Sequence, residues 1–105
     1  MDLNYKIVYT ESAVNDLDKI LTYLSNYGNP MILTNFKNEI NHKLDTIKLF
    51  PESNAVVFSQ HDYNYRKMII RSYIFVYYVD ELNHEINIFR IFHELEDYQN
   101  KLGYK

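Results

Sequence analysis

The chain has 105 residues, 47% of them apolar, and a formal net charge of −3, so we expect one domain spanning residues 1–105 with a single core. It has no cysteine and two residues each of glycine and proline, which excludes disulfides, thiolate chemistry, zinc–thiolate sites and glycine-rich nucleotide-binding loops. The negative charge gives no general attraction to nucleic acid or to anionic lipid.

The first predicted element is a short strand in "NYKIVYT", where Tyr5, Ile7 and Tyr9 alternate with Lys6 and Val8. An alternation with a period of two is typical of a strand that buries one face. We therefore expect the chain to enter the fold as a strand.

A helix is predicted to follow that strand. Thr10 is a suitable N-cap, and Glu11 suits the positive end of the helix dipole. The sequence "NYGNP" ends the helix, with Gly28 expected in the left-handed conformation and Pro30 expected to begin the next helix. Apolar residues recur at spacings of three and four and mark the buried face: Ala13, Leu17, Ile20, Leu21 and Leu24.

The second predicted helix is longer and ends before Pro51, because the Leu-Phe-Pro sequence cannot continue a helix. Together the two helices are expected to form an antiparallel hairpin. Its apolar stripe consists of Leu33, Phe36, Ile40, Leu44 and Ile47.

The rest of the chain is predicted to be mostly β. "AVVF" at Ala55–Phe58 is a candidate edge segment, and "YRKMII", "YIFVYYV" and "INIFRIF" are three β-branched and aromatic runs. Turns are expected at Arg71–Ser72 and Asp80–Glu85, which makes these runs an antiparallel meander, and "ELEDYQNKL" is a candidate last helix. The predicted fold is α+β, β-α-α-β-β-β-α, with a helical hairpin packed on one face of a small antiparallel sheet.

This order of elements resembles the RelE/ParE superfamily of bacterial toxins from type II toxin–antitoxin modules. "YTESAVNDLDKILTYL" resembles the opening strand and first helix, and "FKNEINHKLDTIKLFPES" resembles the second helix with its "L-x-x-F-P" exit. "YRKMIIRSYIFVYYVDELNHEINIFRIFHELEDY" resembles the remaining strands, including the closing "R-x-x-H" strand. The resemblance covers nearly the whole chain, and it is the order and spacing of the segments that make it specific.

The resemblance implies a growth-inhibiting toxin held inactive by a tightly bound cognate antitoxin, which is a separate chain. Two activities occur on this fold. RelE-like members cut messenger RNA on the ribosome, and ParE-like members inhibit DNA gyrase.

RNA cleavage without a metal needs a base, an acid and cations that hold the phosphate. The sequence departs from the RelE-like pattern, because Ile74 stands where the arginine of the third strand is usual and Glu94 stands where some members carry a tyrosine. His93 remains as a candidate general base. The alternative is that His93 is a strand-end residue bonded to a nearby carboxylate such as Glu94 or Asp97.

The basic residues of the predicted sheet are candidates for binding the target. They could gather along one edge of the sheet and hold an anionic group, or they could be paired in salt bridges with Asp62, Glu94 or Glu96, which are worth little when exposed. The four candidates are Arg66, Lys67, Arg71 and Arg90.

Tyrosines divide into two expected groups. Tyr73, Tyr77 and Tyr78 are expected to pack in the sheet, with Tyr77 and Tyr78 on opposite faces. A second group is expected to bind the antitoxin across the hairpin and sheet, because the chain has more amphipathic surface than a small core needs: Tyr5, Tyr9, Tyr23 and Tyr27.

The function that the sequence favours is that of a ParE-like toxin, which is not an enzyme and binds a protein target such as DNA gyrase. One alternative is a RelE-like endoribonuclease that uses His93 with Arg66, Arg71 or Arg90 on the ribosome with its mRNA. Another is a degenerate member that binds an antitoxin without toxicity.

We expect no cofactor, no metal and no membrane partner. We also expect a cytoplasmic location, because no stretch approaches the roughly 18–20 apolar residues of a membrane span and the N-terminus lacks signal-peptide features.

Overall fold

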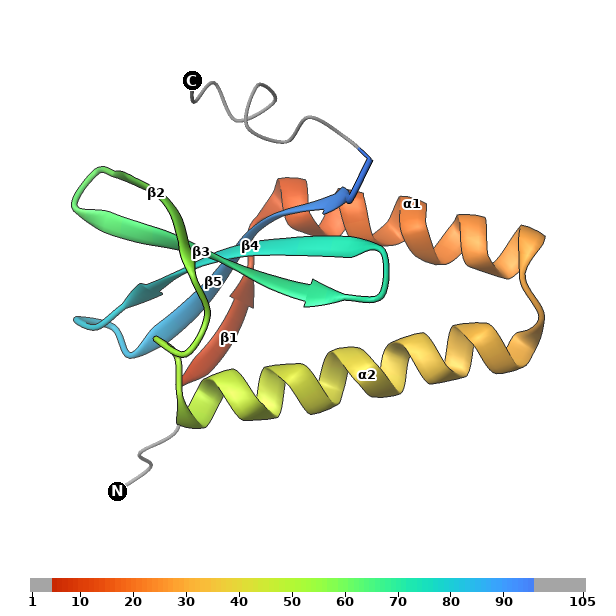
Figure 1. Ribbon diagram of the computed structural model, residues 1–105, viewed down its shortest axis with the longest axis horizontal. Helices are drawn as coiled ribbons and strands as arrows, with labels where there is room; N and C mark the ends of the chain where they lie inside the picture. The colour runs from red at the N-terminus through yellow and green to blue at the C-terminus, as the bar shows by residue number, and fades with distance from the viewer. Residues whose placement is uncertain (1–4, 96–105) are drawn as a thin grey trace.

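The computed structural model describes residues 5–95, in which two helices pack on one face of a five-stranded sheet (Figure 1). This arrangement confirms the predicted α+β class and the helical hairpin. The candidate last helix in "ELEDYQNKL" lies almost wholly beyond residue 95, outside the described residues. The elements in chain order are β1 (Lys6–Tyr9), α1 (Glu11–Tyr27), α2 (Pro30–Leu49), β2 (Val56–Gln60), β3 (Tyr63–Ile70), β4 (Tyr73–Asp80) and β5 (Glu85–His93).

The strand order is β1-β5-β4-β3-β2, and the meander from β3 to β5 is antiparallel as predicted. Two features differ from the prediction. The candidate edge segment forms a strand, β2, whose pairing with β3 shifts register between Val56 and Phe58, so four strands follow the helices. The turn from β2 to β3 uses His61 and Asp62 at positive φ, without the glycine that usually signals a hairpin. In addition, β1 pairs parallel with β5, because the long connection between them supplies the crossover that a parallel pair needs.

The helix ends follow the predicted capping residues, with one correction. Thr10 Oγ1 accepts a hydrogen bond from the Ala13 N–H at 3.1 Å, and Pro30 opens α2. Gly28 was expected in the left-handed region, but its φ is −108°. Glycine is needed there for a different reason, because a Cβ would lie 2.8 Å from the Leu24 carbonyl oxygen, to which the Gly28 N–H donates.

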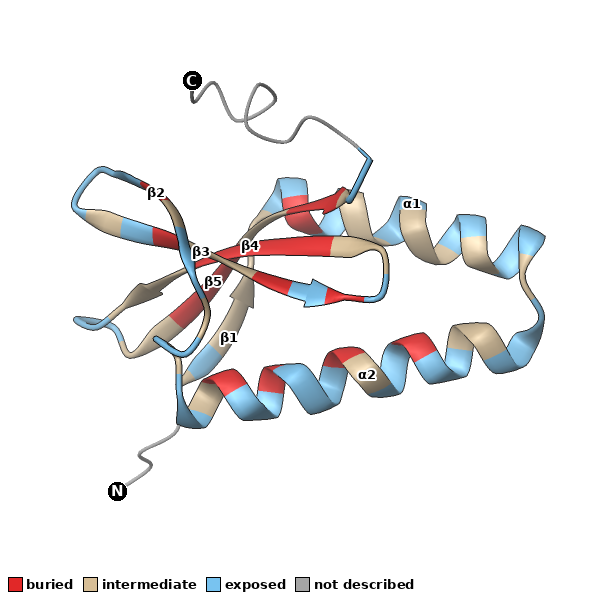
Figure 2. Ribbon diagram, viewed as in Figure 1, coloured by how far each residue is buried: buried red, intermediate tan, exposed pale blue. Residues whose placement is uncertain are grey.

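The main core lies between the helices and the sheet (Figure 2). The two helices contribute unequally to it, since α2 buries four side chains and α1 buries Ala13 alone among the described residues. The rest of the apolar face of α1 is partly exposed, including Leu17 and Leu21. The buried members of this core are Ala13, Phe36, Ile40, Leu44, Ile47, Met68, Ile70, Phe75, Tyr77, Ile86, Ile88 and Ile91.

The opposite face of the sheet carries a second apolar cluster, which contains no helix residue. The predicted packing role of the tyrosines is confirmed, because Tyr77 belongs to the helix-facing core and its neighbour Tyr78 packs against this second cluster. The ring of Tyr65 stacks on that of Phe58, with centroids 4.5 Å apart. The buried members are Phe58, Tyr65, Ile74, Val76 and Phe92.

The hydroxyl of Tyr77 joins the sheet to the exit of α2. It donates to the Pro51 carbonyl at 2.8 Å and accepts from Asn54 Nδ2 at 3.1 Å. Burial raises the pKa of Tyr77 above its ordinary 10.0, although the bond from Asn54 acts in the opposite direction. The fold therefore favours the neutral phenol at this position.

We predict that the protein loses stability as the pH rises above 10 and that Tyr77 causes part of the loss. Because the pKa of Tyr77 is raised in the fold, the unfolded chain releases the phenol proton at a lower pH than the folded chain does. The contribution of this difference to the free energy of unfolding is therefore fully present below pH 10 and is lost as the pH rises through the folded pKa. Tyr77→Phe should lower the free energy of unfolding at pH 7 by about 1–2 kcal/mol, because the Pro51 carbonyl loses its donor. Urea unfolding at pH 7 and pH 11 measures both effects.

The matched control is Tyr27→Phe, because Tyr27 is 77% exposed. Tyr77→Phe should show a shallower alkaline loss than the control. Equal slopes in the two variants would contradict a role for the buried phenol.

Candidate functional site

Residues 89–93 of β5 extend past the end of β1, and α1 takes the place of a neighbouring strand there. The Thr10 N–H donates to the Ile88 carbonyl at 3.0 Å, and Thr10 Oγ1 donates to the Phe89 carbonyl at 2.7 Å. The Ile91 N–H donates to Asp16 Oδ2 at 2.9 Å. The N-cap Thr10 and the Asp16 side chain of α1 thus provide hydrogen-bond partners along the open edge of β5, whose backbone groups would otherwise be left unpaired.

Asp16 also forms a bidentate ion pair with Arg90. Arg90 Nε donates to Asp16 Oδ2 at 2.7 Å, and Nη2 donates to Oδ1 at 3.1 Å. The Asp16 side chain is 14% exposed, so this pair is better shielded than an ordinary surface pair. The guanidinium also lies 4.9 Å from the centre of the Phe92 ring, a cation–π distance.

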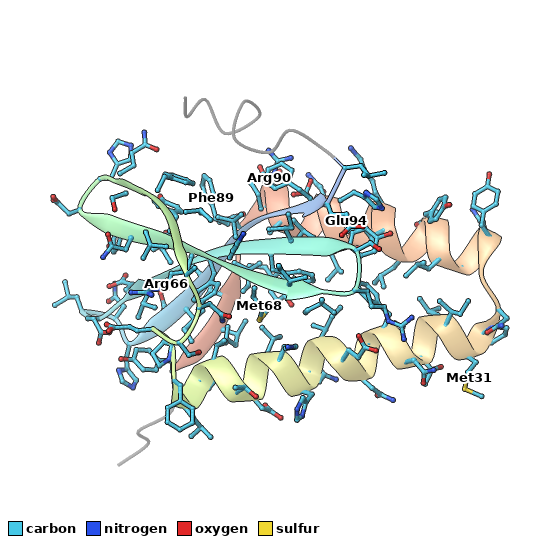
Figure 3. All side chains as sticks on the ribbon, in the orientation of Figure 1. Met31, Arg66, Met68, Phe89, Arg90 and Glu94 are labelled. Atoms are coloured by element: carbon cyan, nitrogen blue, oxygen red, sulfur yellow. The ribbon has the colours of Figure 1, made fainter. Side chains whose placement is uncertain are left out.

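A bulge in β5 directs Arg90 to this position. Tyr77 pairs with Ile88 but Val76 pairs with Arg90, so Phe89 is an extra residue in the strand. A bulge changes the direction of the side chains that follow it. Here Ile88 and Ile91 both face the helices although they are three residues apart, and Arg90 lies between them beside α1 (Figure 3).

A pocket of about 200 Å³ lies beside this ion pair, between α1 and the ends of β4 and β5. It combines cationic, hydroxyl and apolar lining groups, so it could hold a small polar group on an apolar stem. Its lining residues are Asp16, Lys19, Ile20, Tyr73, Arg90, Ile91, Phe92 and His93.

His93 ends β5 at the rim of this pocket. Its ring lies edge-on to Tyr73, with centroids 5.4 Å apart, and its Nδ1 accepts a hydrogen bond from the Leu95 N–H at 3.1 Å. A neutral imidazole with Nδ1 as acceptor carries its hydrogen on Nε2. The described contacts of His93 therefore orient the ring at the strand end, while Asp97, one of the carboxylates considered as its partner, lies outside the described residues.

The other basic candidates lie elsewhere in the fold. Arg66 Nη1 donates to the carbonyls of Glu52 at 3.1 Å and Asn54 at 2.7 Å, which ties β3 to the loop after α2. Arg71, at positive φ in the turn between β3 and β4, forms a 3.0 Å ion pair with Glu39 of α2.

The four basic residues do not form one patch. Lys67 and Arg90 both pair with Val76 of the outer cluster, from the two strands that flank β4, so the register gives these two positions the face opposite the helices. Arg66 pairs with Tyr77 and so has the other face, and Arg71 lies in a turn. Figure 3 shows Arg66 and Arg90 well separated. Of the four, Arg90 shares a pocket with His93, and the acidic partners of Arg90 and Arg71 lie on the helices rather than on the sheet.

Sequence reasoning missed Asp16 and Lys19. Their spacing of three residues puts them on one side of a helix, which is a weak signal because exposed helices commonly carry such pairs. Nothing local links Asp16 to Arg90, which is 74 residues away in the chain.

The structure splits the four tyrosines predicted to bind the antitoxin. Tyr23 and Tyr27 lie together near the end of α1, with ring centroids 5.0 Å apart, and are 56% and 77% exposed. Tyr9 lines a groove of about 230 Å³ between α1 and α2, and burial raises its pKa. Tyr5 donates to the Glu81 carboxylate at 2.8 Å and stacks on His84 at the other end of the sheet; the bond to Glu81 raises the Tyr5 pKa.

Two kinds of feature are missing from residues 5–95. No three histidine or acidic side chains in this range come together as a metal site requires. Within the same range, neither helix has the length and apolar content needed to cross a bilayer.

Comparisons with known proteins place this geometry in context. A family model described as the ParE toxin of the type II toxin–antitoxin system parDE matches residues 7–98. A chain of the RelBE2 toxin–antitoxin complex from Mycobacterium tuberculosis is 18% identical, with a TM-score of 0.59, and the match covers 86% of this chain and 98% of that chain. A chain of the chromosomal ParDE system from P. aeruginosa is 16% identical, with a TM-score of 0.65, and the match covers 88% of this chain and 98% of that chain. No curated protein matches the sequence.

We predict that Asp16→Ala lowers the free energy of unfolding by about 2–4 kcal/mol, because it leaves the Arg90 charge and the Ile91 N–H without their common acceptor. Asp18→Ala is the matched control, since Asp18 is an exposed aspartate of the same helix. Chemical denaturation of the three proteins measures the difference. Equal losses in both variants would mean that the Asp16 contacts contribute nothing specific.

Proposed function

Because the chain belongs to the ParE toxin family of type II toxin–antitoxin systems, we propose that it arrests growth by binding an essential protein target. DNA gyrase is the precedent in this family. We further propose that a cognate antitoxin neutralises the toxin.

The ion pairs and hydrogen bonds of the arginines are the main reason to propose a protein target and not RNA. Cleavage of RNA without a metal needs cations that hold the scissile phosphate. In this chain Arg90 is bound by Asp16, Arg71 by Glu39, and Arg66 by two backbone carbonyls. A phosphate would have to displace these partners, and Glu94 follows His93 directly. This arrangement supports an inhibitor that acts by binding.

One observation favours the RelE-like alternative. Lys19 and Arg90 line the same pocket as His93, so two cations stand near a candidate base. If that pocket held the scissile phosphate, His93 would activate the 2′-hydroxyl. The experiment below separates this activity from protein binding.

The surface proposed for the antitoxin runs along α1. Tyr23 and Tyr27 are exposed aromatic residues of the kind that dominate binding energies. Another side of the same helix contributes Leu17 and Leu21 to the groove between α1 and α2, which Tyr9 also lines. A partner helix laid along this groove would gain roughly 25 cal/mol per Å² of apolar surface before ordering costs. Tyr5 lies neither in this groove nor beside Tyr23 and Tyr27, and it is proposed as a peripheral contact.

We predict that inducing the chain stops growth with loss of DNA supercoiling and without codon-positioned cuts in mRNA. His93→Gln should keep the growth arrest, because the glutamine amide can still accept from the Leu95 N–H but cannot act as a base near neutral pH. Plasmid topology and mRNA end mapping after induction measure the two activities.

Three outcomes distinguish the alternatives. Codon-positioned cuts that disappear in His93→Gln would establish the nuclease and refute the proposal. Growth arrest with neither cuts nor loss of supercoiling would direct the search to a protein target other than gyrase. No arrest, despite tight binding of the antitoxin, would identify a member that has lost its toxicity.

We predict that the double variant Tyr23→Ala, Tyr27→Ala binds the antitoxin at least about tenfold more weakly, because two exposed aromatic anchors are lost. Leu82→Ala is the control, since Leu82 is 94% exposed in the turn between β4 and β5. Calorimetry with the product of the neighbouring open reading frame gives the affinities. Unchanged binding by the double variant would place the antitoxin elsewhere.

A further inference from the structure

We propose that the pocket between α1 and β5 receives an acidic side chain, aspartate or glutamate, of the target protein, with Lys19 as the group that binds its carboxylate. This inference rests on the proposed function and names the chemistry that the target must present. It adds Lys19 to the residues expected to contact the target.

The charges around the pocket leave one cation in excess. The charges of Asp16 and Arg90 neutralise each other in their bidentate ion pair. Lys19 is exposed, and its ammonium has no ion-pair partner within residues 5–95. An incoming anion would therefore meet the Lys19 charge without having to break the pair that fixes α1 on β5.

A hydroxyl donor stands on the wall opposite α1. Tyr73 lines the pocket from β4, and its hydroxyl forms no hydrogen bond with the described residues. Burial raises the pKa of Tyr73 above its ordinary value, so the hydroxyl keeps its proton. An ammonium and a protonated phenol on facing walls are complementary to a carboxylate.

The size and walls of the pocket favour an amino-acid side chain over a nucleotide. A volume of about 200 Å³ is below the roughly 300–1,000 Å³ of pockets that hold drug-sized ligands. Ile20 and Ile91 offer apolar contact to the methylene stem of an aspartate or glutamate. The single excess positive charge of the pocket matches one carboxylate better than a doubly charged phosphate, and the net charge of −3 does not attract nucleic acid.

The binding experiment uses the labelled full chain and short peptides followed by NMR. Ac-Gly-Glu-Gly-NH₂ should shift the amide signals of Lys19 and Ile91, and the neutral isostere Ac-Gly-Gln-Gly-NH₂ should leave them in place. Lys19→Gln should weaken binding of the glutamate peptide about fivefold, the effect of losing one partly exposed ion pair. Lys43→Gln, at an exposed position of α2 outside the pocket, should bind like the wild type.

A growth assay connects the pocket to the target. Lys19→Glu should relieve growth arrest at matched expression, and Lys43→Glu should not. Equal shifts with both peptides, tighter binding of inorganic phosphate than of the glutamate peptide, or full toxicity of Lys19→Glu would each overturn the inference. The proposed function is tested separately, because the wild-type chain alone reveals whether supercoiling or mRNA is affected.

Discussion

The carboxylate of Asp16 is the contact on which the arrangement of the molecule depends. It accepts from Arg90 Nε and Nη2 and from the Ile91 N–H, so one side chain fixes a helix, a strand edge and a cation together. Thr10 satisfies the neighbouring carbonyls of β5 in the same way. The first turns of α1 thereby complete a sheet whose edge strand β1 is too short to do so, and a strand edge that would invite pairing with another chain is covered.

This contact also sets the chemical character of the site. It commits Arg90 to a structural partner and leaves Lys19, one turn further along α1, to supply the charge of the adjacent pocket. An arginine that stabilises the fold is a poor phosphate clamp, because a ligand must first break its ion pair. The same feature that holds α1 in place is therefore one ground for the proposal that the chain binds a protein surface and does not cleave RNA.

The two helices have different roles in this fold. The stripe of α2 is buried on the sheet, whereas α1 buries Ala13 and leaves leucines and two tyrosines accessible. Apolar surface that the core does not use is available to a partner. The tyrosines of the sheet pack instead, and Tyr77 uses its hydroxyl to hold the exit of α2. Aromatic residues thus stabilise the sheet and, on α1, provide the surface proposed for the antitoxin.

The sequence by itself determined the local elements and the family resemblance. The apolar stripe of α2, the Thr10 cap, the Pro30 start and the β-branched runs depend on neighbours a few residues apart, and these predictions are confirmed. The predicted stripe of α1 faces the core but is fully buried at Ala13 alone among the described residues. The tertiary structure decided the rest. The bulge at Phe89 breaks the period of two and places Arg90 beside Asp16, 74 residues away, and the parallel pairing of β1 depends on the whole path of the chain. Periodicity records which residues share a face of one element, but it cannot record strand register or which helix crosses a strand edge, and the candidate site is built from those two features.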